Sequence, residues 1–384
     1  MANIADALED KYISRAADLE RLKESVRQRS LGYLRELQTE LERQIRDISP
    51  TEPAAPSWRR RRLEKLLAYV KVTIREAYSA ARSAANREIR PLVREQAGFT
   101  VSTLNSALGV DIASVTLTPE RISALMSDTL IEGAPSGDWW SRQESNLLRK
   151  FEDQIRQGVL QGETNAQLVQ RVRGTATGKR EVYWLNGKRK VYVEFAGGIM
   201  ETGTRQAEAL VRSSVQAVSN EANLETLRQN SDIVQGVQAV VTLDLRTTTI
   251  CIGRSSAVWD LETGKPISGT TESFPGAPPW HWNCRTFLIP YLKSWESLRR
   301  KQLPPGKHNK ILEIEPTTRA SMDGQVAAGT SYEAWLRSKP KSVQLEKLGP
   351  TKYELWQENK ITFTDLVNQR GRPLTVAELQ EKYA

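Results

Sequence analysis

Apolar residues recur every third or fourth position along residues 1–90, and charged residues fill the positions between them. This spacing places the apolar side chains on one face of an α-helix. It predicts a long amphipathic helix over residues 1–49 and a second from Trp58 towards Arg90-Pro91, separated by a proline-containing break. The first helix is open to two interpretations, a coiled-coil arm or an ordinary helix packed on its own domain. Its apolar seam is made of Leu19, Leu22, Val26, Leu34, Leu37, Leu41 and Ile48.

Four shorter helices are predicted further along the chain, after a less regular segment at residues 99–117. The first three begin at Thr118, Asp138 and Thr164, whose side chains can accept a hydrogen bond from a free backbone N–H. Each of these three also meets a glycine near its expected end. The four helices are expected from Thr118 to near Gly133, from Asp138 to Gly158 or Gly162, from Thr164 to near Gly174, and from Thr204 to Gln229.

Residues 180–196 break the helical spacing and predict an inserted β-hairpin. Two runs rich in β-branched and aromatic residues flank Asn186-Gly187, and Asn-Gly between such runs is a strong hairpin signal. Two interpretations are open, a plain surface hairpin or a ribbon that probes a groove or a partner. The basic residues of its tip are Lys188, Arg189 and Lys190.

These patterns together predict a mainly α-helical fold with a small α+β core near residues 234–292. Short strands are expected at residues 237–243 and 286–290, on either side of that core. The expected segments are an N-terminal long-helix region (1–133), a helical region with the inserted hairpin (134–232), the β-containing core (233–300), a linker rich in proline and glycine (301–330) and a C-terminal helical tail (331–384).

The chain is basic, with a formal net charge of +9 over 384 residues, which favours an anionic partner such as nucleic acid or an acidic protein face. The run of four arginines after Trp58 is either a contact for DNA phosphates or a solvated helix start. With the hairpin tip it predicts weak, non-specific binding of double-stranded DNA. No apolar stretch approaches the roughly 18 residues of a membrane span, so no membrane partner is expected. The run consists of Arg59, Arg60, Arg61 and Arg62.

The residues best suited to site chemistry gather in one window, Asp244–Arg285. It contains both cysteines of the chain and one of its two histidines. Three interpretations are open: a metal site, a disulfide in an oxidising compartment, or a metal-free buried cluster. Few cysteines and no apparent signal peptide favour a reducing cytosol. The metal ligands would be Cys251, His281 and Cys284, with Asp244 as the nearest candidate fourth ligand and His308 as a weaker one.

The start of the window predicts an ion pair. Residues 237–243 alternate as a strand that leads into Asp244, so Asp244 and Arg246 would share one face of it. A buried contact between these two side chains would fix the passage from sheet to loop. Replacing either with alanine is then expected to lower the stability.

The order and spacing of the window resemble the signature of the phage Mu F-like head morphogenesis proteins, which are minor capsid proteins of tailed phages. The resemblance extends more loosely over residues 139–384. Relatives with the full signature carry two further cysteines, at positions that correspond to Thr248 and Thr286, and their loss weakens the zinc interpretation. The matching residues are Asp244, Arg246, Thr247, Cys251, Gly264, Pro278, Pro279, His281, Cys284 and Arg285.

The resemblance implies a minor head protein in the virion, present in few copies at the head interior or near the portal, and in the host cytoplasm during assembly. Its expected partners are the portal protein, other capsid proteins and packaged or ejected DNA. The chain is not expected to be an enzyme or to need a cofactor, although zinc stays open. One alternative is a metal-dependent hydrolase or nuclease that uses Cys251, His281 and Cys284. The other is a non-specific DNA-binding module.

Overall fold

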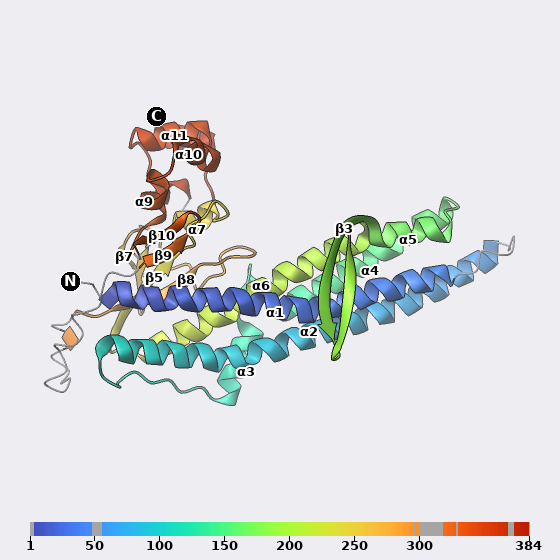
Figure 1. Cartoon of the computed structure of the whole chain (residues 1–384), viewed down its shortest axis with the longest axis horizontal. Coiled ribbons are helices and arrows are strands. Elements are labelled where there is room, and N and C mark those ends of the chain that lie inside the picture. Colours follow the sequence, from blue (N-terminus) through green and yellow to red (C-terminus); the bar gives the residue numbers. More distant parts are fainter. Residues whose placement is uncertain are drawn as a thin grey trace. The chain divides into compact units, whose positions relative to one another are not determined.

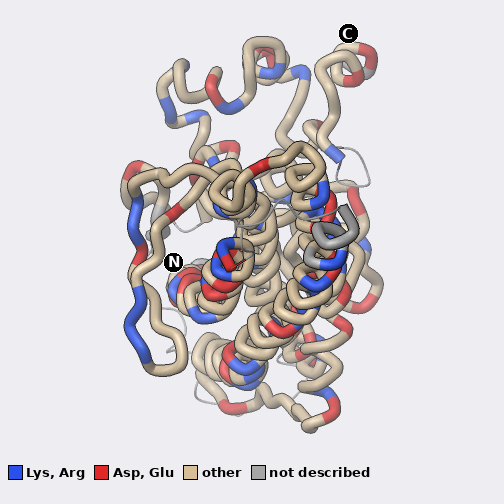
Figure 2. Tube along the Cα trace, turned by 90° about the vertical axis from the view of Figure 1, so that its right-hand side faces the viewer, with Lys and Arg blue, Asp and Glu red and all other residues tan. Residues whose placement is uncertain are grey.

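The computed structural model describes residues 4–47, 56–294, 297–298, 318–327, 329–367 and 372–383. Helix accounts for 60% of it and strand for 16%, which confirms a mainly α-helical fold with a small β component (Figure 1). Within these ranges, no helix combines the length and the apolar character that crossing a bilayer requires. Basic and acidic residues are interspersed along the traced chain (Figure 2).

The chain forms two compact units that do not follow the expected division in sequence order. Each unit is assembled from separate stretches of the chain, because helices α1, α2 and α6 each contribute residues to both. Unit 1 contains Met1–Leu19, Leu92–Leu125 and Gln216–Ala384, and unit 2 contains Glu20–Pro91 and Met126–Val215. The three shared helices are α1 (Ile4–Arg46), α2 (Pro56–Leu108) and α6 (Ile199–Gln229).

Helix α2 is longer than expected, because it continues through Pro91 to Leu108. A proline inside a helix removes one backbone hydrogen bond. Here the residues after Pro91 keep the helical spacing of buried positions, and burial of that face outweighs the lost bond. The predicted irregular segment at residues 99–117 is therefore helical in its first half. The buried positions are Leu92, Val93, Gln96, Ala97, Thr100, Leu104 and Leu108.

Unit 2 contains the short strands and helices that lie between the end of α3 and the hairpin. Helix α5 is capped as predicted: the Thr164 side chain accepts from the N–H of Gln167, whose side chain accepts from the N–H of Thr164. Asp138 is not the cap of α4, because that helix already begins at Ser136, and Asp138 lies in its first turn. These elements are α3 (Pro119–Asp128, at the boundary between the units), β1 (Leu130–Ile131), β2 (Ala134–Pro135), α4 (Ser136–Leu160) and α5 (Asn165–Arg173).

The predicted hairpin is present in unit 2 as β3 (Gly174–Leu185) and β4 (Lys188–Gly197). Asn186 and Gly187 both have positive φ, 51° and 74°, as a two-residue type I′ turn requires. One face of the ribbon packs on α1. There the Tyr183 hydroxyl donates to Glu36 at 2.7 Å.

Unit 1 contains a four-stranded antiparallel sheet in the order β7-β6-β5-β8. Its core joins the sheet to α2 and α6. Trp259 is fully buried there, beside Leu104 and Leu224. The strands are β5 (Val234–Val240), β6 (Val258–Asp260), β7 (Pro266–Ser268) and β8 (Phe287–Leu292), and the one-turn helix α7 (Thr249–Ile252) follows β5.

The C-terminal segment packs on this sheet region. A hairpin occupies residues 318–327 of the expected linker, and Leu243 forms a β-bridge with Ser321 of that hairpin. The last helices bury their aromatic side chains in the same cluster as Cys251 and Cys284. The elements are β9 (Thr318–Ser321), β10 (Gly324–Ala327), α9 (Tyr332–Arg337), α10 (Lys341–Leu348), α11 (Pro350–Gln357), the 3₁₀ helix η2 (Phe363–Leu366) and α12 (Val376–Tyr383).

Candidate functional site

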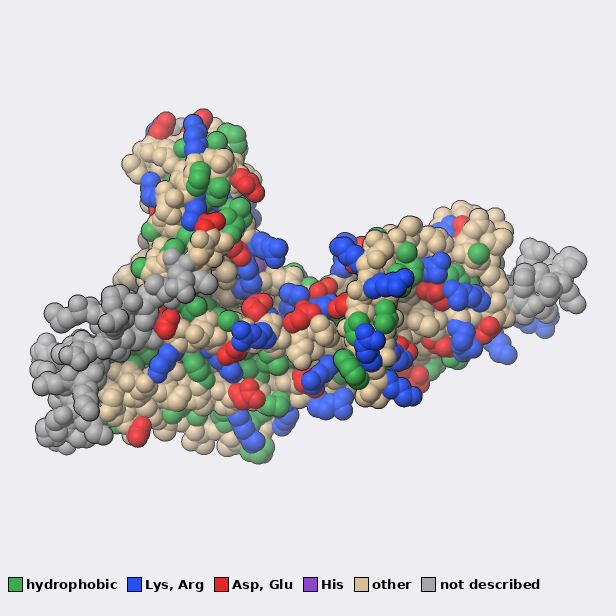
Figure 3. Space-filling model, viewed as in Figure 1, with side chains coloured by type: hydrophobic (Ala, Val, Ile, Leu, Met, Phe, Trp, Pro, Cys, Tyr) green, Lys and Arg blue, Asp and Glu red, His purple; other side chains and the backbone are tan. Residues whose placement is uncertain are grey.

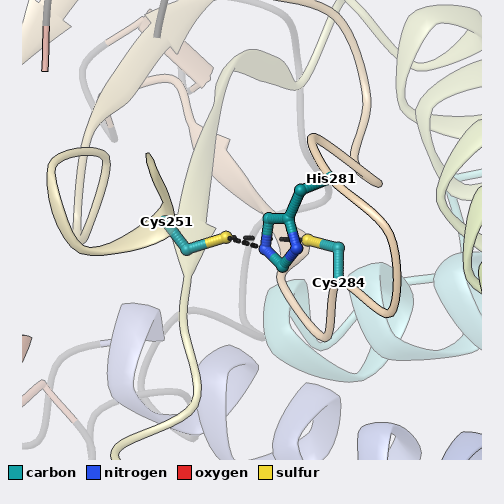
Figure 4. Close-up of side chains that lie close together, drawn as sticks. All are labelled: Cys251, His281 and Cys284. Atoms are coloured by element: carbon teal, nitrogen blue, oxygen red, sulfur yellow. Dashed lines mark hydrogen bonds between the residues drawn. The ribbon is translucent and has the colours of Figure 1, made fainter. Parts of the chain in front are cut away.

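The rare residues of the Asp244–Arg285 window meet in unit 1 (Figure 4). Cys251 is carried by α7, while His281 and Cys284 lie in the loop before β8. The Cys251 sulfur is 3.1 Å from Nε2 of His281 and 3.6 Å from the Cys284 sulfur. All three ligand atoms lie within 4.8 Å of one another. The clustering expected from the sequence is therefore found in the structure.

Both cysteines are buried thiols. Only 2% of Cys251 and 1% of Cys284 is exposed, and neither forms a disulfide. Their sulfurs lie 3.6 Å apart, well beyond the roughly 2.05 Å of a disulfide bond. The disulfide interpretation would need the two sulfurs to approach by more than an ångström.

The His281 ring is oriented by the backbone. Its Nδ1 lies 2.8 Å from the carbonyl oxygen of Trp282. A carbonyl only accepts hydrogen bonds, so Nδ1 carries the proton and Nε2 presents its lone pair to Cys251. The same arrangement, with one ring nitrogen bonded to a carbonyl, orients histidine ligands of metals.

The two thiols titrate as a pair. The hydrogen bond with Cys284, together with burial, holds the pKa of Cys251 well above its usual range. Burial opposes ionisation of Cys284 too, but its interactions with Cys251 and His281 outweigh burial and hold the pKa of Cys284 well below its usual range. Cys251 therefore holds its proton more tightly than Cys284 does.

Two threonines line the cluster, at the positions singled out in the sequence. The hydroxyls of Thr248 and Thr286 lie near enough to Cys251 to lower the pKa of its thiol. Thr286 is buried. The Thr248 Oγ1 atom is also buried, and it meets no partner at hydrogen-bonding geometry.

Asp244 is not a ligand of the cluster, and the prediction that it pairs with Arg246 is wrong. The strand β5 ends at Val240, so Asp244 begins a turn instead of sharing a strand face with Arg246. Its carboxylate accepts from the backbone N–H groups of Arg246 and Thr247, both at 3.0 Å. Both of its oxygens also accept from Arg285, at 2.7 and 2.8 Å. The Arg246 side chain is exposed.

The other signature residues shape the backbone around this pair. Thr247 donates its hydroxyl to the carbonyl of Thr242 at 2.5 Å, which closes the turn after β5. Gly264 has φ of 66° in the turn between β6 and β7, a backbone conformation that suits glycine. The Pro278–Pro279 peptide is cis. These four residues shape the backbone around the ligand set of Cys251, His281 and Cys284.

Amide side chains of α6 hold the loop that carries His281 and Cys284. Gln216 donates to the carbonyl of Thr286 at 2.8 Å. Asn220 donates to the carbonyls of Pro278 and Thr286, at 2.9 and 3.1 Å. Asn223 donates to the carbonyl of Leu288 at 2.9 Å. Sequence analysis missed Gln216 and Asn223, although polar residues that recur three and four positions apart along one helix are a usable signal.

The C-terminal tail holds the turn that precedes Cys251. The Lys347 ammonium donates to the carbonyls of Leu245 and Thr247, at 3.0 and 2.5 Å. The Tyr332 hydroxyl donates to the carbonyl of Asp244 at 3.0 Å. Nothing in the local sequence around Lys347 indicates these contacts.

A buried ion pair lies beside the cluster. Arg254, three residues after Cys251, makes two hydrogen bonds to Glu272, at 2.9 and 2.6 Å, and the side chains are 5% and 11% exposed. The Arg254 guanidinium also lies over the Trp280 ring, 4.7 Å from its centroid. The loop between β7 and β8 is thus fixed to α7 by charge as well as by packing.

The predicted nucleic-acid contacts are only partly described. The side chains of Arg59, Arg60 and Arg62, and the whole of His308, lie outside the described residues, while Arg61 is exposed. On the hairpin, Lys190 is not a free cation, because it pairs with Glu36 at 2.6 Å. Lys188 and Arg189 are exposed, and within the described part of the chain neither forms an ion pair.

The outer face of the β3–β4 hairpin mixes apolar and basic side chains (Figure 3). Trp184 is 60% exposed and stands opposite Arg189 in the strand register. Val182 stands opposite Val191 in the next pair on the same face, and both are exposed. We call these residues, with Arg180, the hairpin outer face.

The chain matches no family model, no curated protein and no solved structure. Three ligand atoms converge in a buried site, and within the described residues no carboxylate belongs to that group. Such a site can hold a cation or share a proton between two thiols, whereas a hydrolytic mechanism would also need a general base.

Proposed function

We propose that the protein is a minor head protein of a tailed phage, of the Mu F-like kind. The observation that carries the proposal is the convergence of the signature residues. Asp244 and Arg285, 41 positions apart, are joined by two hydrogen bonds, and Cys251 meets His281 and Cys284 beside them. A signature whose members hold one another in place suits a structural protein better than an enzyme.

The contacts of the window support a structural role. Its loop is held by amides of α6, and its turn is held by Lys347 and Tyr332 of the tail. Three segments that are distant in sequence are thereby fixed to one another. In a head protein, such a centre would stabilise the fold, while other surfaces meet the portal protein, capsid proteins and DNA.

The hairpin outer face supports a contact with double-stranded DNA. Cations bind phosphates without reading sequence, and an exposed aromatic ring offers a flat apolar surface beside them. Arg189 and Arg180 supply the charge of this face, Lys188 adds a cation next to the turn, and Trp184 supplies the ring. The net charge of +9 favours the same partner.

The proposal is tested by particle composition. Heads would be isolated from a lysate of a phage or induced prophage that carries this gene, and their proteins quantified by mass spectrometry. We expect the protein in mature heads, in few copies, and in complexes captured with the portal protein during assembly. Absence from both the heads and the portal complexes would overturn the proposal.

A matched pair of variants sharpens this test. Arg285→Ala removes the partner of Asp244, and Arg246→Ala removes an exposed side chain two positions from the same residue. We expect Arg285→Ala to reduce incorporation into heads and Arg246→Ala to leave it unchanged. Equal incorporation of both variants would show that the Asp244–Arg285 pair is not needed for incorporation into heads.

The hydrolase alternative has one observation in its favour, the three-ligand set of Cys251, His281 and Cys284. Catalytic zinc sites also use three protein ligands and leave one position for water. Incubation of the protein with zinc and duplex DNA tests it directly. Cleavage that disappears in Cys284→Ser, while the variant stays folded, would favour that alternative over the structural role.

A further inference from the structure

We propose that Cys251, His281 and Cys284 bind a thiophilic divalent cation, with zinc as the expected ion. The inference goes beyond the head-protein proposal, since it holds or fails whatever particle the protein belongs to. It reverses the preference for a metal-free cluster that the sequence suggested.

The spacing of the ligand atoms fits a zinc ion. Zinc–sulfur bonds of about 2.3 Å in a tetrahedral site place two sulfurs about 3.8 Å apart, and a sulfur and a nitrogen about 3.5 Å apart. The sulfurs of Cys251 and Cys284 are 3.6 Å apart, and the Cys251 sulfur is 3.1 Å from Nε2 of His281. Shifts of a few tenths of an ångström would bring the sulfur–sulfur and sulfur–nitrogen distances to those values.

The ligands are already oriented by the rest of the fold. The Trp282 carbonyl fixes the His281 ring so that Nε2 faces the sulfurs. Asn220 holds the backbone at both ends of the loop, at Pro278 and at Thr286. An oriented site loses little conformational freedom when an ion binds, which favours affinity.

The donor set selects the class of ion. Two sulfurs and one imidazole nitrogen suit zinc, whereas magnesium and calcium prefer oxygen ligands. Both thiols release their protons to solvent on binding, and two thiolates balance the double positive charge. No net charge is then added to a site in which both cysteines are buried.

The fourth coordination position of the cation is filled by a small exogenous ligand such as water. Asp244 cannot supply it while both of its oxygens accept from Arg285. The buried Oγ1 of Thr248, which has no hydrogen-bond partner, lies beside Cys251 and offers a bond to a ligand in that position.

The test uses the full chain, purified from zinc-supplemented cells under reducing conditions and without chelator. Elemental analysis is expected to find one equivalent of zinc per chain. After zinc removal, titration with Co²⁺ is expected to produce the charge-transfer absorption of cobalt–thiolate bonds. His281→Gln, at a partly exposed position, is expected to weaken Co²⁺ binding by at least about the 10–100-fold that loss of an outer partner costs.

The matched control is Arg246→Gln, which changes an exposed side chain of the same window and is expected to leave binding unchanged. A measurement on the unaltered protein avoids variants that fail to fold. Zinc is expected to slow alkylation of Cys251 and Cys284 by at least about tenfold, and a chelator to restore the rate. Substoichiometric zinc, alkylation that ignores zinc, or a Cys251–Cys284 disulfide in the protein isolated from cytoplasm would each overturn the proposal.

Discussion

Arg285 donates hydrogen bonds to both carboxylate oxygens of Asp244, at 2.7 and 2.8 Å, across 41 positions of the chain. Asp244 begins the turn after β5, and Arg285 follows directly on Cys284. The ion pair therefore holds together the two segments that carry Cys251 and Cys284. It also explains why Asp244 supplies no ligand to the cluster.

The first prediction concerns the stability of this pair. Arg285→Ala and Asp244→Ala are each expected to lower the free energy of unfolding by about 2–3 kcal/mol, because each leaves a charged group without its partner. The side chains are 27% and 21% exposed, so the cost stays below that of a fully buried pair. Urea unfolding curves measure it.

Arg246→Ala is the matched control for that prediction. Its side chain is exposed, so the change is expected to stay within about 0.5 kcal/mol. The double variant of Asp244 and Arg285 is expected to cost less than the sum of the two single changes. Additive costs, or a loss in Arg246→Ala as large as in Arg285→Ala, would contradict the pairing.

The second prediction is a dependence on pH. Burial opposes ionisation of Asp244, but hydrogen bonds from Arg285 outweigh it and lower the pKa of the carboxyl below its ordinary value. A carboxyl with a depressed pKa in the folded state stabilises fully above its unfolded pKa of about 3.9, and this stability is lost as the pH falls through the folded value. Asp244→Asn is expected to have a lower free energy of unfolding than the unaltered protein at neutral pH, and this difference should shrink below about pH 4. A deficit that stays constant down to pH 2 in melting experiments would argue against this.

The third prediction concerns the buried pair of Arg254 and Glu272. Glu272→Ala is expected to lower the free energy of unfolding by about 3–5 kcal/mol, since it leaves the guanidinium buried without its partner. The control is Arg205→Ala, whose side chain is 74% exposed beside Glu201 and is expected to matter by less than about 1 kcal/mol. Chemical unfolding distinguishes the two, and a small effect of Glu272→Ala would mean that solvent reaches the pair.

The fourth prediction concerns DNA. The protein is expected to bind duplex DNA without sequence preference, with an affinity that falls steeply with salt. Replacing Lys188 and Arg189 with alanine is expected to reduce the salt slope by up to about 2. Lys190→Ala, which removes a cation already paired with Glu36, should reduce it less. Binding that ignores salt, or no binding at low salt, would refute the contact.

Sequence patterns predicted the parts of this protein that local chemistry determines. The hairpin follows from Asn186-Gly187, where two neighbouring residues define the turn, and the meeting of Cys251 with Cys284 follows from the gathering of rare residues in one window. The partner of Asp244 could not be found in this way. The alternation of β5 suggested Arg246, but the strand ends before Asp244, and the true partner lies at position 285.

Tertiary contacts account for the other differences. Helix α2 continues past Pro91 because its next turns are buried, which the proline itself does not indicate. The tail was expected to be a separate region, but its aromatic residues share a core with Cys251 and Cys284. Periodicity identifies a helix and its apolar face, but not the surface on which that face packs.

The last prediction follows from that shared core. Lys347 donates to the carbonyls of Leu245 and Thr247, and burial lowers the pKa of its ammonium group. Lys347→Met keeps the aliphatic stem but leaves both carbonyls without this donor. The variant is expected to lose about 1–2 kcal/mol, less than the full worth of two charged hydrogen bonds, because the cost of burying the ammonium is removed as well.

A second measurement links this loss to the site. The turn held by Lys347 leads directly into α7, so its loosening is expected to speed alkylation of Cys251 in the folded protein. Lys360→Met is the control, because Lys360 and its partner Glu358 are both more than half exposed. We expect that control to change neither stability nor alkylation. If Lys347→Met also changes neither, Lys347 does not hold the turn, and the position of Cys251 depends on the other contacts of the window.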